Sequence, residues 1–297
     1  MEVIRKIDIH AHATAFPQHI PAYYSTGAKF PSAEEMIGLY DKVGIEKGVL
    51  LPIVSPENQP TIMTTEGCME LAARYPDRFV WFCNVDPRMG TAYANPTYLL
   101  EYYKSRGARG FGELTVPMYA DAPELERIYA ALEELELPMT IHVSVPQSGR
   151  YGIMDELGLP RLEGILRRHP RLRILGHSQV FWSEISADNN EEIRGGYPSG
   201  KVIPGRIVEL MRRYENLYCD LSAGSGMYAM MRDPAFTVGF LEEFSDRILY
   251  GCDICHKDAV HQYTFDEFLT SLRADGSVRE ETYRKIVREN AVKLLNL

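Results

Sequence analysis

Two histidines stand two residues apart near the start of the chain, in the segment Asp8-Ile9-His10-Ala11-His12. The preceding run is apolar and alternating, which is typical of a β-strand whose side chains two residues apart point to the same side. Two imidazoles on one side of a strand are a candidate pair of metal ligands. A His-x-His pair also arises by chance on a strand surface, so the pair alone leaves both interpretations open.

Further polar side chains fall at or just after the ends of later apolar segments. They are Glu113, His142, His177 and Asp253. In an α/β barrel the carboxyl ends of the strands surround one mouth, and active sites are built there. We therefore expect these residues to converge with the two histidines, although they lie far apart in the sequence.

Eight apolar segments with strand character alternate with helical patterns along the chain. The predicted strands are 4–9, 47–53, 79–85, 108–113, 139–143, 172–177, 217–221 and 248–252. Among the helical patterns, one opens on Ser32 as N-cap, another has Pro123 near its first turn, and others cover 162–169, 203–214 and 290–295.

Eight strands, each followed by a helix, predict a single (β/α)8 TIM barrel over residues 1–297. An open, doubly wound α/β sheet is the competing architecture, because alternation alone does not show closure. No Gly-x-Gly-x-x-Gly segment follows the first strand, which removes the main reason to prefer a dinucleotide-binding sheet. The long polar stretch at about 182–202 is expected to be a loop over the barrel mouth.

The composition is that of an ordinary globular protein, with 45% hydrophobic and 25% charged residues among 297. The net charge of −9, without a dense basic stripe, argues against nucleic acid as a partner. No apolar run is long enough for a membrane helix. An odd number of cysteines, five, and an N-terminus without signal-peptide character predict a cytoplasmic protein with reduced thiols.

Five short segments, spread in order over the whole chain, carry a family resemblance. They are Asp8-Ile9-His10-Ala11-His12, Thr140-Ile141-His142, Ile174-Leu175-Gly176-His177, Tyr250-Gly251-Cys252-Asp253 and Glu289-Asn290-Ala291. Together they resemble the amidohydrolase superfamily, in particular amidohydrolase family 2, the group that contains aminocarboxymuconate-semialdehyde decarboxylase.

The resemblance implies one divalent metal at the barrel mouth, with zinc expected and manganese or iron as alternatives. Its implied ligands are His10, His12, His142 and Asp253. Imidazole and carboxylate ligands suit these metals, and a bound metal lowers the pKa of water from about 16 towards 7. The resemblance also places His177 beside the metal. Either His177 or Asp253 is then the catalytic base.

Several residues admit more than one interpretation. Glu113 is a tentative ligand of the metal, a hydrogen-bond partner of a histidine, or a substrate contact. Trp182 and His256 are tentative substrate-binding residues, and core packing is an equal alternative for Trp182. Cys252 and Cys255 have the spacing of a zinc or redox pair, but no second Cys-x-x-Cys is present, so packing or lining of the mouth is expected.

The leading functional hypothesis is a metal-dependent hydrolase that cleaves an amide, ester or lactone of a small molecule. The alternative is a non-oxidative, metal-dependent decarboxylase of an unsaturated or aromatic acid. Such an acid calls for a basic residue at the pocket, and no arginine can be assigned immediately after the early strands. A catalytically inactive metal-binding barrel is a third hypothesis. The expected partner is a small-molecule substrate, and a homodimer follows only from the resemblance.

Overall fold

The computed structural model describes residues 3–22, 27–58, 63–89, 96–146 and 150–297. Its strands are parallel and fall into two sheets. The first runs in the order β1 (Lys6–Ala11), β2 (Ile45–Leu50) and β3 (Phe79–Trp81). The second runs in the order β4 (Phe111–Leu114), β5 (Met139–Ser144), β7 (Ile174–His177), β8 (Leu217–Asp220) and β9 (Ile248–Leu249).

Backbone hydrogen bonds join the two sheets at both edges and so close the barrel. Beside β3 and β4, the Cys83 amide donates to the Gly110 carbonyl, and the Gly112 amide donates to the Cys83 carbonyl, each at 2.9 Å. Between β1 and the chain after β9, the Ile9 amide donates to Tyr250 at 3.0 Å. The predicted TIM barrel is therefore confirmed, and the open sheet is excluded.

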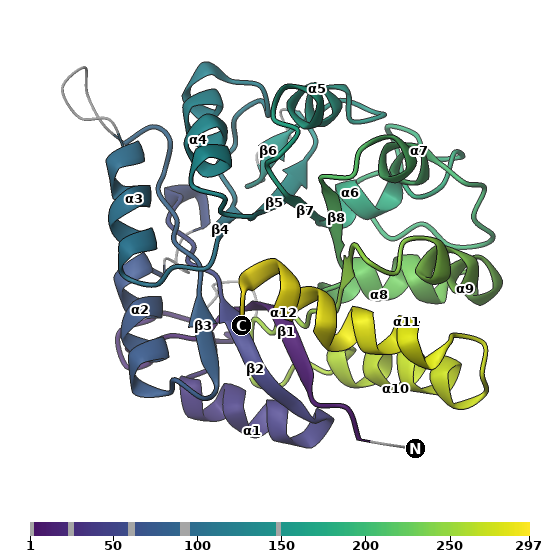
Figure 1. The fold of residues 1–297 in the computed structure, drawn as a ribbon, viewed down its shortest axis with the longest axis horizontal. Helices are drawn as coiled ribbons and strands as arrows, with labels where there is room; N and C mark the ends of the chain where they lie inside the picture. The colour runs from purple at the N-terminus through teal and green to yellow at the C-terminus, as the bar shows by residue number, and fades with distance from the viewer. Residues whose placement is uncertain (1–2, 23–26, 59–62, 90–95, 147–149) are drawn as a thin grey trace.

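Helices surround the ring of strands, as Figure 1 shows. They are α1 (Ala33–Val43), α2 (Thr65–Arg74), α3 (Thr97–Ser105), α4 (Pro123–Glu134), α5 (Pro160–Arg168), α6 (Gln179–Ser183), α7 (Arg206–Arg213), α8 (Ala223–Met231), α9 (Pro234–Glu243), α10 (His261–Ala274) and α11 (Glu280–Arg284). A short 3₁₀ turn, η1 (Pro56–Asn58), follows β2, and a π-helical turn, η2 (Lys285–Glu289), leads into α12 (Asn290–Leu295). Within the described ranges, no helix is both long and apolar enough to cross a bilayer.

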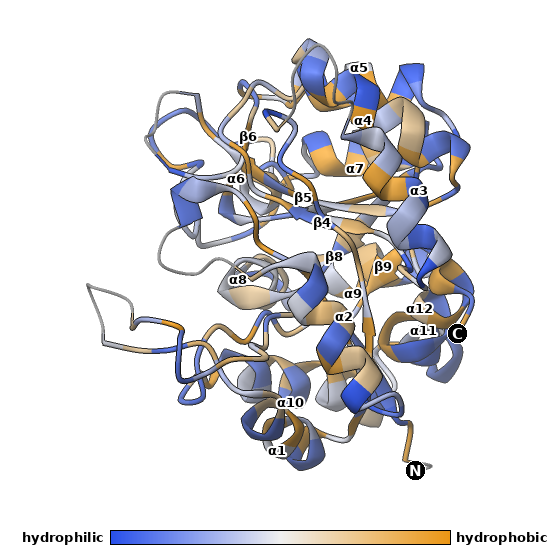
Figure 2. Ribbon diagram, turned by 90° about the vertical axis from the view of Figure 1, so that its left-hand side faces the viewer, coloured by the Kyte–Doolittle hydropathy of each residue, from blue (hydrophilic) through white to orange (hydrophobic). Residues whose placement is uncertain are grey.

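The interior of the barrel is filled by apolar side chains from alternating strand positions. Ile9, Val49 and Leu175 belong to this cluster, together with Leu294 of α12. The Asn290 side chain donates to the carbonyls of Ser245 and Ile248, before and at the start of β9, at 2.7 and 2.8 Å. Helix α12 thus closes the amino-terminal end of the barrel, opposite the mouth. In Figure 2 most helices carry both orange and blue residues, as expected for helices that pack against the barrel on one side only.

All eight predicted strands are present, with their ends shifted by a few residues. Strand β1 covers Lys6–Ala11 rather than 4–9, so His10 lies inside the strand and His12 just beyond it. A further short strand, β6 (Ile153–Met154), pairs with β5 and was not predicted. The Ser32 cap of α1 and the proline at the start of α4 are confirmed.

The stretch predicted as a mouth loop is partly helical. Trp182 and Ser183 belong to α6, and the irregular connection runs from there to α7. Within that connection Arg194 is fully buried, and its guanidinium donates to the backbone carbonyl of Glu156 at 2.9 Å. This segment is therefore anchored against the chain that precedes α5.

Candidate metal centre

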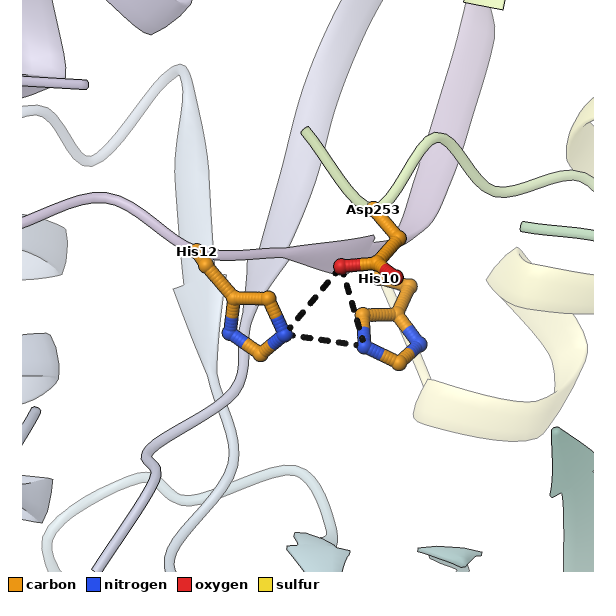
Figure 3. Close-up of side chains that lie close together, drawn as sticks. All are labelled: His10, His12 and Asp253. Atoms are coloured by element: carbon orange, nitrogen blue, oxygen red, sulfur yellow. Dashed lines mark hydrogen bonds and ion pairs between the residues drawn. The ribbon is translucent and has the colours of Figure 1, made fainter. Parts of the chain in front are cut away.

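His10 and His12 lie where the pairing between β1 and β2 becomes irregular. The register shifts between Asp8 and Ala11, and irregularities of this kind re-aim side chains at barrel rims. Both imidazoles are buried, at 0% and 1% exposure. Their Nε2 atoms face each other across 3.0 Å, as Figure 3 shows.

The opposite ring nitrogen of each histidine has a different partner. His12 Nδ1 donates to the Leu51 carbonyl at 3.0 Å, because a carbonyl oxygen can only accept. His10 Nδ1 lies 2.6 Å from Asp220 Oδ2, an ionised carboxylate that also only accepts. Both rings therefore carry a proton at Nδ1. Two Nε2 atoms at this distance need a cation or a proton between them, since two lone pairs would otherwise repel.

The Asp253 carboxylate completes a compact group with these histidines (Figure 3). Its Oδ1 lies 3.4 Å from His12 Nε2 and 3.8 Å from His10 Nε2. Asp253 has a left-handed φ of +49°, which aspartate tolerates better than most residues, and its amide donates to the His10 carbonyl at 2.9 Å. Burial opposes ionisation, but the surrounding imidazoles, above all that of His10, lower the pKa of Asp253 to about 2.

Glu113 bridges this group to His142. Its Oε1 lies 2.7 Å from His142 Nδ1, and its Oε2 lies 3.4 Å from His12 Nε2 and 3.5 Å from His10 Nε2. Burial disfavours the charged form of Glu113, yet the histidines around it hold its pKa well below the usual range. Glu113 is thus an ionised carboxylate that lies close to three of the predicted ligands, His10, His12 and His142.

His177, at the end of β7, approaches the same point from the other side. Its Nε2 lies 3.7 Å from Asp253 Oδ2 and 3.9 Å from Glu113 Oε1. Its Nδ1 lies 3.0 Å from the Ser222 hydroxyl. Burial lowers the pKa of His177 to about 4, and the neighbouring positive His10 acts in the same direction. The ring is therefore neutral near pH 7 and can accept a proton.

Asp220 and Ser222 are site residues that the sequence analysis missed. Asp220 is fully buried at the end of β8, and its Oδ1 accepts from the Ser222 amide at 2.9 Å. Gly251 makes room for it, because a Cβ there would lie 2.7 Å from Asp220 Oδ1. The only signal in the sequence is an acidic residue inside the predicted strand 217–221.

Three of the four candidate ligands, His12, His142 and Asp253, line a cavity of about 120 Å³. Its lining residues among those described are His12, Phe30, Ile53, Glu57, Asn58, Glu113, His142, Tyr151, Asp253 and Cys255. Two carboxylates and two imidazoles of the candidate centre thus reach the cavity wall. A substrate in the cavity would contact the centre directly.

The two residues proposed to bind substrate, Trp182 and His256, are not among the described lining residues of this cavity. Trp182 is 2% exposed, and its indole N–H donates to the Asp220 carbonyl at 3.0 Å, which favours the packing alternative. His256 is half-buried and lies outside the described lining. Cys252 is buried, whereas Cys255 lines the cavity with its Sγ 3.2 Å from Asp253 Oδ1.

The donor set fits a divalent cation. Three groups of side chains bring their ligand atoms within 4.8 Å of one another: His10, His12 and Asp253; His10, His177 and Asp220; and Glu113, His142 and His177. Among these three groups, only the first has two Nε2 atoms that face each other beside a carboxylate. The Nδ1 atoms of the same two histidines are hydrogen-bonded to other groups, Asp220 and the Leu51 carbonyl. Imidazole and carboxylate ligands of this kind bind Zn²⁺, Mn²⁺ and Fe²⁺.

Comparison with known protein families gives a match over nearly the whole chain. The amidohydrolase family model matches residues 7–297. The chain belongs to the amidohydrolase family. Members of the family include hydrolases and decarboxylases, and this amidohydrolase is an enzyme. No curated protein matches the sequence significantly.

Solved structures of the same fold resemble this amidohydrolase over its whole length. The 2,6-dihydroxybenzoate decarboxylase from Rhizobium is 18% identical, covers 99% of each chain and has a TM-score of 0.61. A probable 2-pyrone-4,6-dicarboxylic acid hydrolase from Acinetobacter baumannii is 14% identical over 99% of this chain and 100% of its own, with a TM-score of 0.60. A dihydroxybenzoic acid decarboxylase from Polaromonas sp. JS666, with bound manganese, is 18% identical over 99% and 98%, with a TM-score of 0.59. At these identities the likeness establishes the TIM-barrel fold.

Proposed function

We propose that this amidohydrolase is a metal-dependent hydrolase that cleaves an amide, ester or lactone bond of a small molecule. The observation that carries the proposal is the contact of His10 Nε2 with His12 Nε2 at 3.0 Å, beside the Asp253 carboxylate. His10, His12, His142 and Asp253 would hold one divalent cation, with zinc preferred over manganese or iron. Asp253 and Glu113 supply the negative charge that balances it.

A bound divalent cation would supply Lewis acidity and lower the pKa of a water molecule from about 16 towards 7. The protein's own part is to accept and return the proton. His177 is placed for this role, because its neutral Nε2 faces the carboxylates while Ser222 holds its Nδ1. Asp253 would orient the attacking water as well as hold the cation.

Glu113 has a second assignment in this proposal. Its short contact with His142 Nδ1, at 2.7 Å, makes it the partner that orients this histidine. Its Oε2, at 3.4 and 3.5 Å from the two Nε2 atoms, keeps it within reach of the cation. We therefore propose one metal ion and assign Glu113 to charge balance and orientation.

Decarboxylation is the second candidate, and solved structures of the same fold favour it. Two of them are decarboxylases of dihydroxybenzoates, one with manganese bound. The two reactions leave different products, because decarboxylation releases carbon dioxide and hydrolysis releases a new acid group. Product analysis therefore separates them.

The direct test is a product screen with metal-loaded protein. Esters, lactones and amides are followed by acid release, and dihydroxybenzoates are followed by carbon dioxide release. The His177→Asn variant serves as the control for contaminating activity. We expect acid release by the wild type and its loss in the variant. Carbon dioxide release that depends on His177, without acid release, would replace hydrolysis by decarboxylation.

A further inference from the structure

The wall of the cavity carries more negative charge than one cation balances. Among the described lining residues three are carboxylates, Glu57, Glu113 and Asp253, and none is Lys or Arg. A divalent cation at the candidate centre offsets Glu113 and Asp253, which contact the same histidines. Glu57, in the turn η1, remains as a further negative group on the wall.

Glu57 is held in place by Arg88, which follows β3. The guanidinium binds the carboxylate at both oxygens, with Nη1 2.5 Å from Oε1 and Nη2 2.8 Å from Oε2. The Arg88 side chain is 35% exposed and that of Glu57 is 32% exposed. A paired fork of this kind fixes the carboxylate in direction as well as in position.

Arg88 does not cancel the charge of Glu57, because it is shared with a second carboxylate. Its Nε lies 2.8 Å from Asp86 Oδ1, and its Nη2 lies 2.5 Å from Asp86 Oδ2. Asp86 is buried. The group Asp86, Arg88 and Glu57 therefore has a net charge of −1, and the guanidinium has most of its donors committed to protein carboxylates.

We propose that Glu57, fixed by Arg88, selects substrates by charge: the cavity accepts a neutral or cationic hydrogen-bond donor opposite Glu57 and disfavours a second carboxylate on the substrate. This inference rests on the proposed metal-dependent function and names its substrate class. Suitable groups are hydroxyl, amide N–H and ammonium groups, each of which can donate to a carboxylate. Dicarboxylic acids are the class that the wall disfavours.

Three probes with the same metal-binding head and different tails test the inference. They are butyrohydroxamic acid, which is neutral, succinic acid monohydroxamate, which is anionic, and 3-aminopropionohydroxamic acid, which is cationic. Dissociation constants are measured by calorimetry with zinc-loaded protein. We expect the anionic probe to bind at least about fivefold more weakly than the neutral one. This is the scale of the repulsion between two like charges about 4 Å apart in water. The cationic probe is expected to bind as well as the neutral one or better.

Two variants should move this ratio in opposite directions. Glu57→Gln removes the negative charge and frees donors of Arg88, so the anionic probe should recover to within about twofold of the neutral one. Arg88→Met leaves two unneutralised carboxylates and should increase the discrimination. Glu46→Gln is the matched control, since Glu46 is 33% exposed and paired with Arg288, but lies near the start of β2 at the other end of the barrel.

Each remaining outcome is decisive. Equal binding of anionic and neutral probes by the wild type, or an unchanged ratio in Glu57→Gln, would overturn the inference and leave the metal site standing. A ratio that moves equally in Glu46→Gln would overturn it as well, because the effect would then come from net charge. Failure of the protein to take up metal would overturn the proposed function and this inference together.

Discussion

Asp220 Oδ2 lies 2.6 Å from His10 Nδ1, so a fully buried carboxylate sets the orientation of a candidate metal ligand. The same oxygen lies 3.6 Å from His177 Nδ1. Burial opposes ionisation of Asp220, but its contact with His10 lowers its pKa below the usual value. One side chain on β8 therefore connects a proposed ligand on β1 with the proposed proton acceptor on β7.

Replacing Asp220 by asparagine should weaken metal binding without removing a ligand. The amide is neutral, so it neither offsets the charge at His10 nor enforces a proton at Nδ1. We expect the metal affinity to fall by about 10- to 100-fold, the usual cost of losing such a partner. Competition with a fluorescent zinc chelator measures it. Asp246→Asn, at an exposed position, is the control. A metal affinity of Asp220→Asn equal to that of the wild type would contradict the orienting role of Asp220.

Gly251→Ala should disturb the surroundings of Asp220 from the segment just after the neighbouring strand β9. The new Cβ would lie 2.7 Å from Asp220 Oδ1 and 2.8 Å from the Ser222 Cβ, so these groups must shift. We expect a loss of about 1–3 kcal/mol in the free energy of unfolding and weaker metal binding. Gly239→Ala in α9 is the matched control, because nothing lies within 4 Å of its Cβ position. Chemical denaturation of metal-free protein should find Gly239→Ala at least as stable as wild type, because alanine favours a helix interior over glycine. Stability of Gly251→Ala equal to wild type would refute the close contact.

His177→Asn should separate turnover from metal binding. The variant keeps the proposed ligands but lacks the nitrogen that accepts the proton. We expect one equivalent of metal to be retained and kcat to fall by about 100-fold or more, the scale of general acid–base catalysis. Metal analysis and steady-state kinetics on the same preparation measure both. Loss of the metal itself would make His177 a ligand.

Trp182→Phe tests the packing role that the structure gives this residue. The variant leaves the buried Asp220 carbonyl without its indole donor and removes ring volume beside the core. We expect the free energy of unfolding to fall by about 2–4 kcal/mol, from the lost hydrogen bond and the cavity. Trp81→Phe, at a buried position of β3, controls for loss of ring volume away from the site. A changed KM with unchanged stability would instead restore a substrate contact for Trp182.

The barrel and the position of the candidate centre could be predicted from the sequence. Alternating apolar segments indicate repeated strand–helix units, and the polar residues at their ends mark one mouth. Of the four expected ligands, His10, His12 and Asp253 form one group, whereas His142 forms another with Glu113 and His177. The ends of the short strands are predicted less well. Strand β9, for example, has only two residues, and the barrel closes beside it through a hydrogen bond between the Ile9 amide and the Tyr250 carbonyl, which no local pattern records.

Other features depend on contacts that no local pattern records. The role of Asp220 arises because β8 brings it beside His10, more than two hundred positions earlier in the chain. Trp182 looked like part of a loop because polar residues follow it, whereas α6 turns its ring into the core. The charge of the cavity wall also depends on tertiary structure, since Glu57 and Arg88 come from separate connections.

The proposed metal centre is tested most directly by the metal content of protein purified without chelator or nickel, compared with the His10→Ala/His12→Ala double variant. Elemental mass spectrometry gives the stoichiometry. We expect about one equivalent of zinc, manganese or iron in the wild type and none in the double variant. A wild type that binds no metal even with excess in solution, or a double variant with full occupancy, would contradict the proposed metal centre.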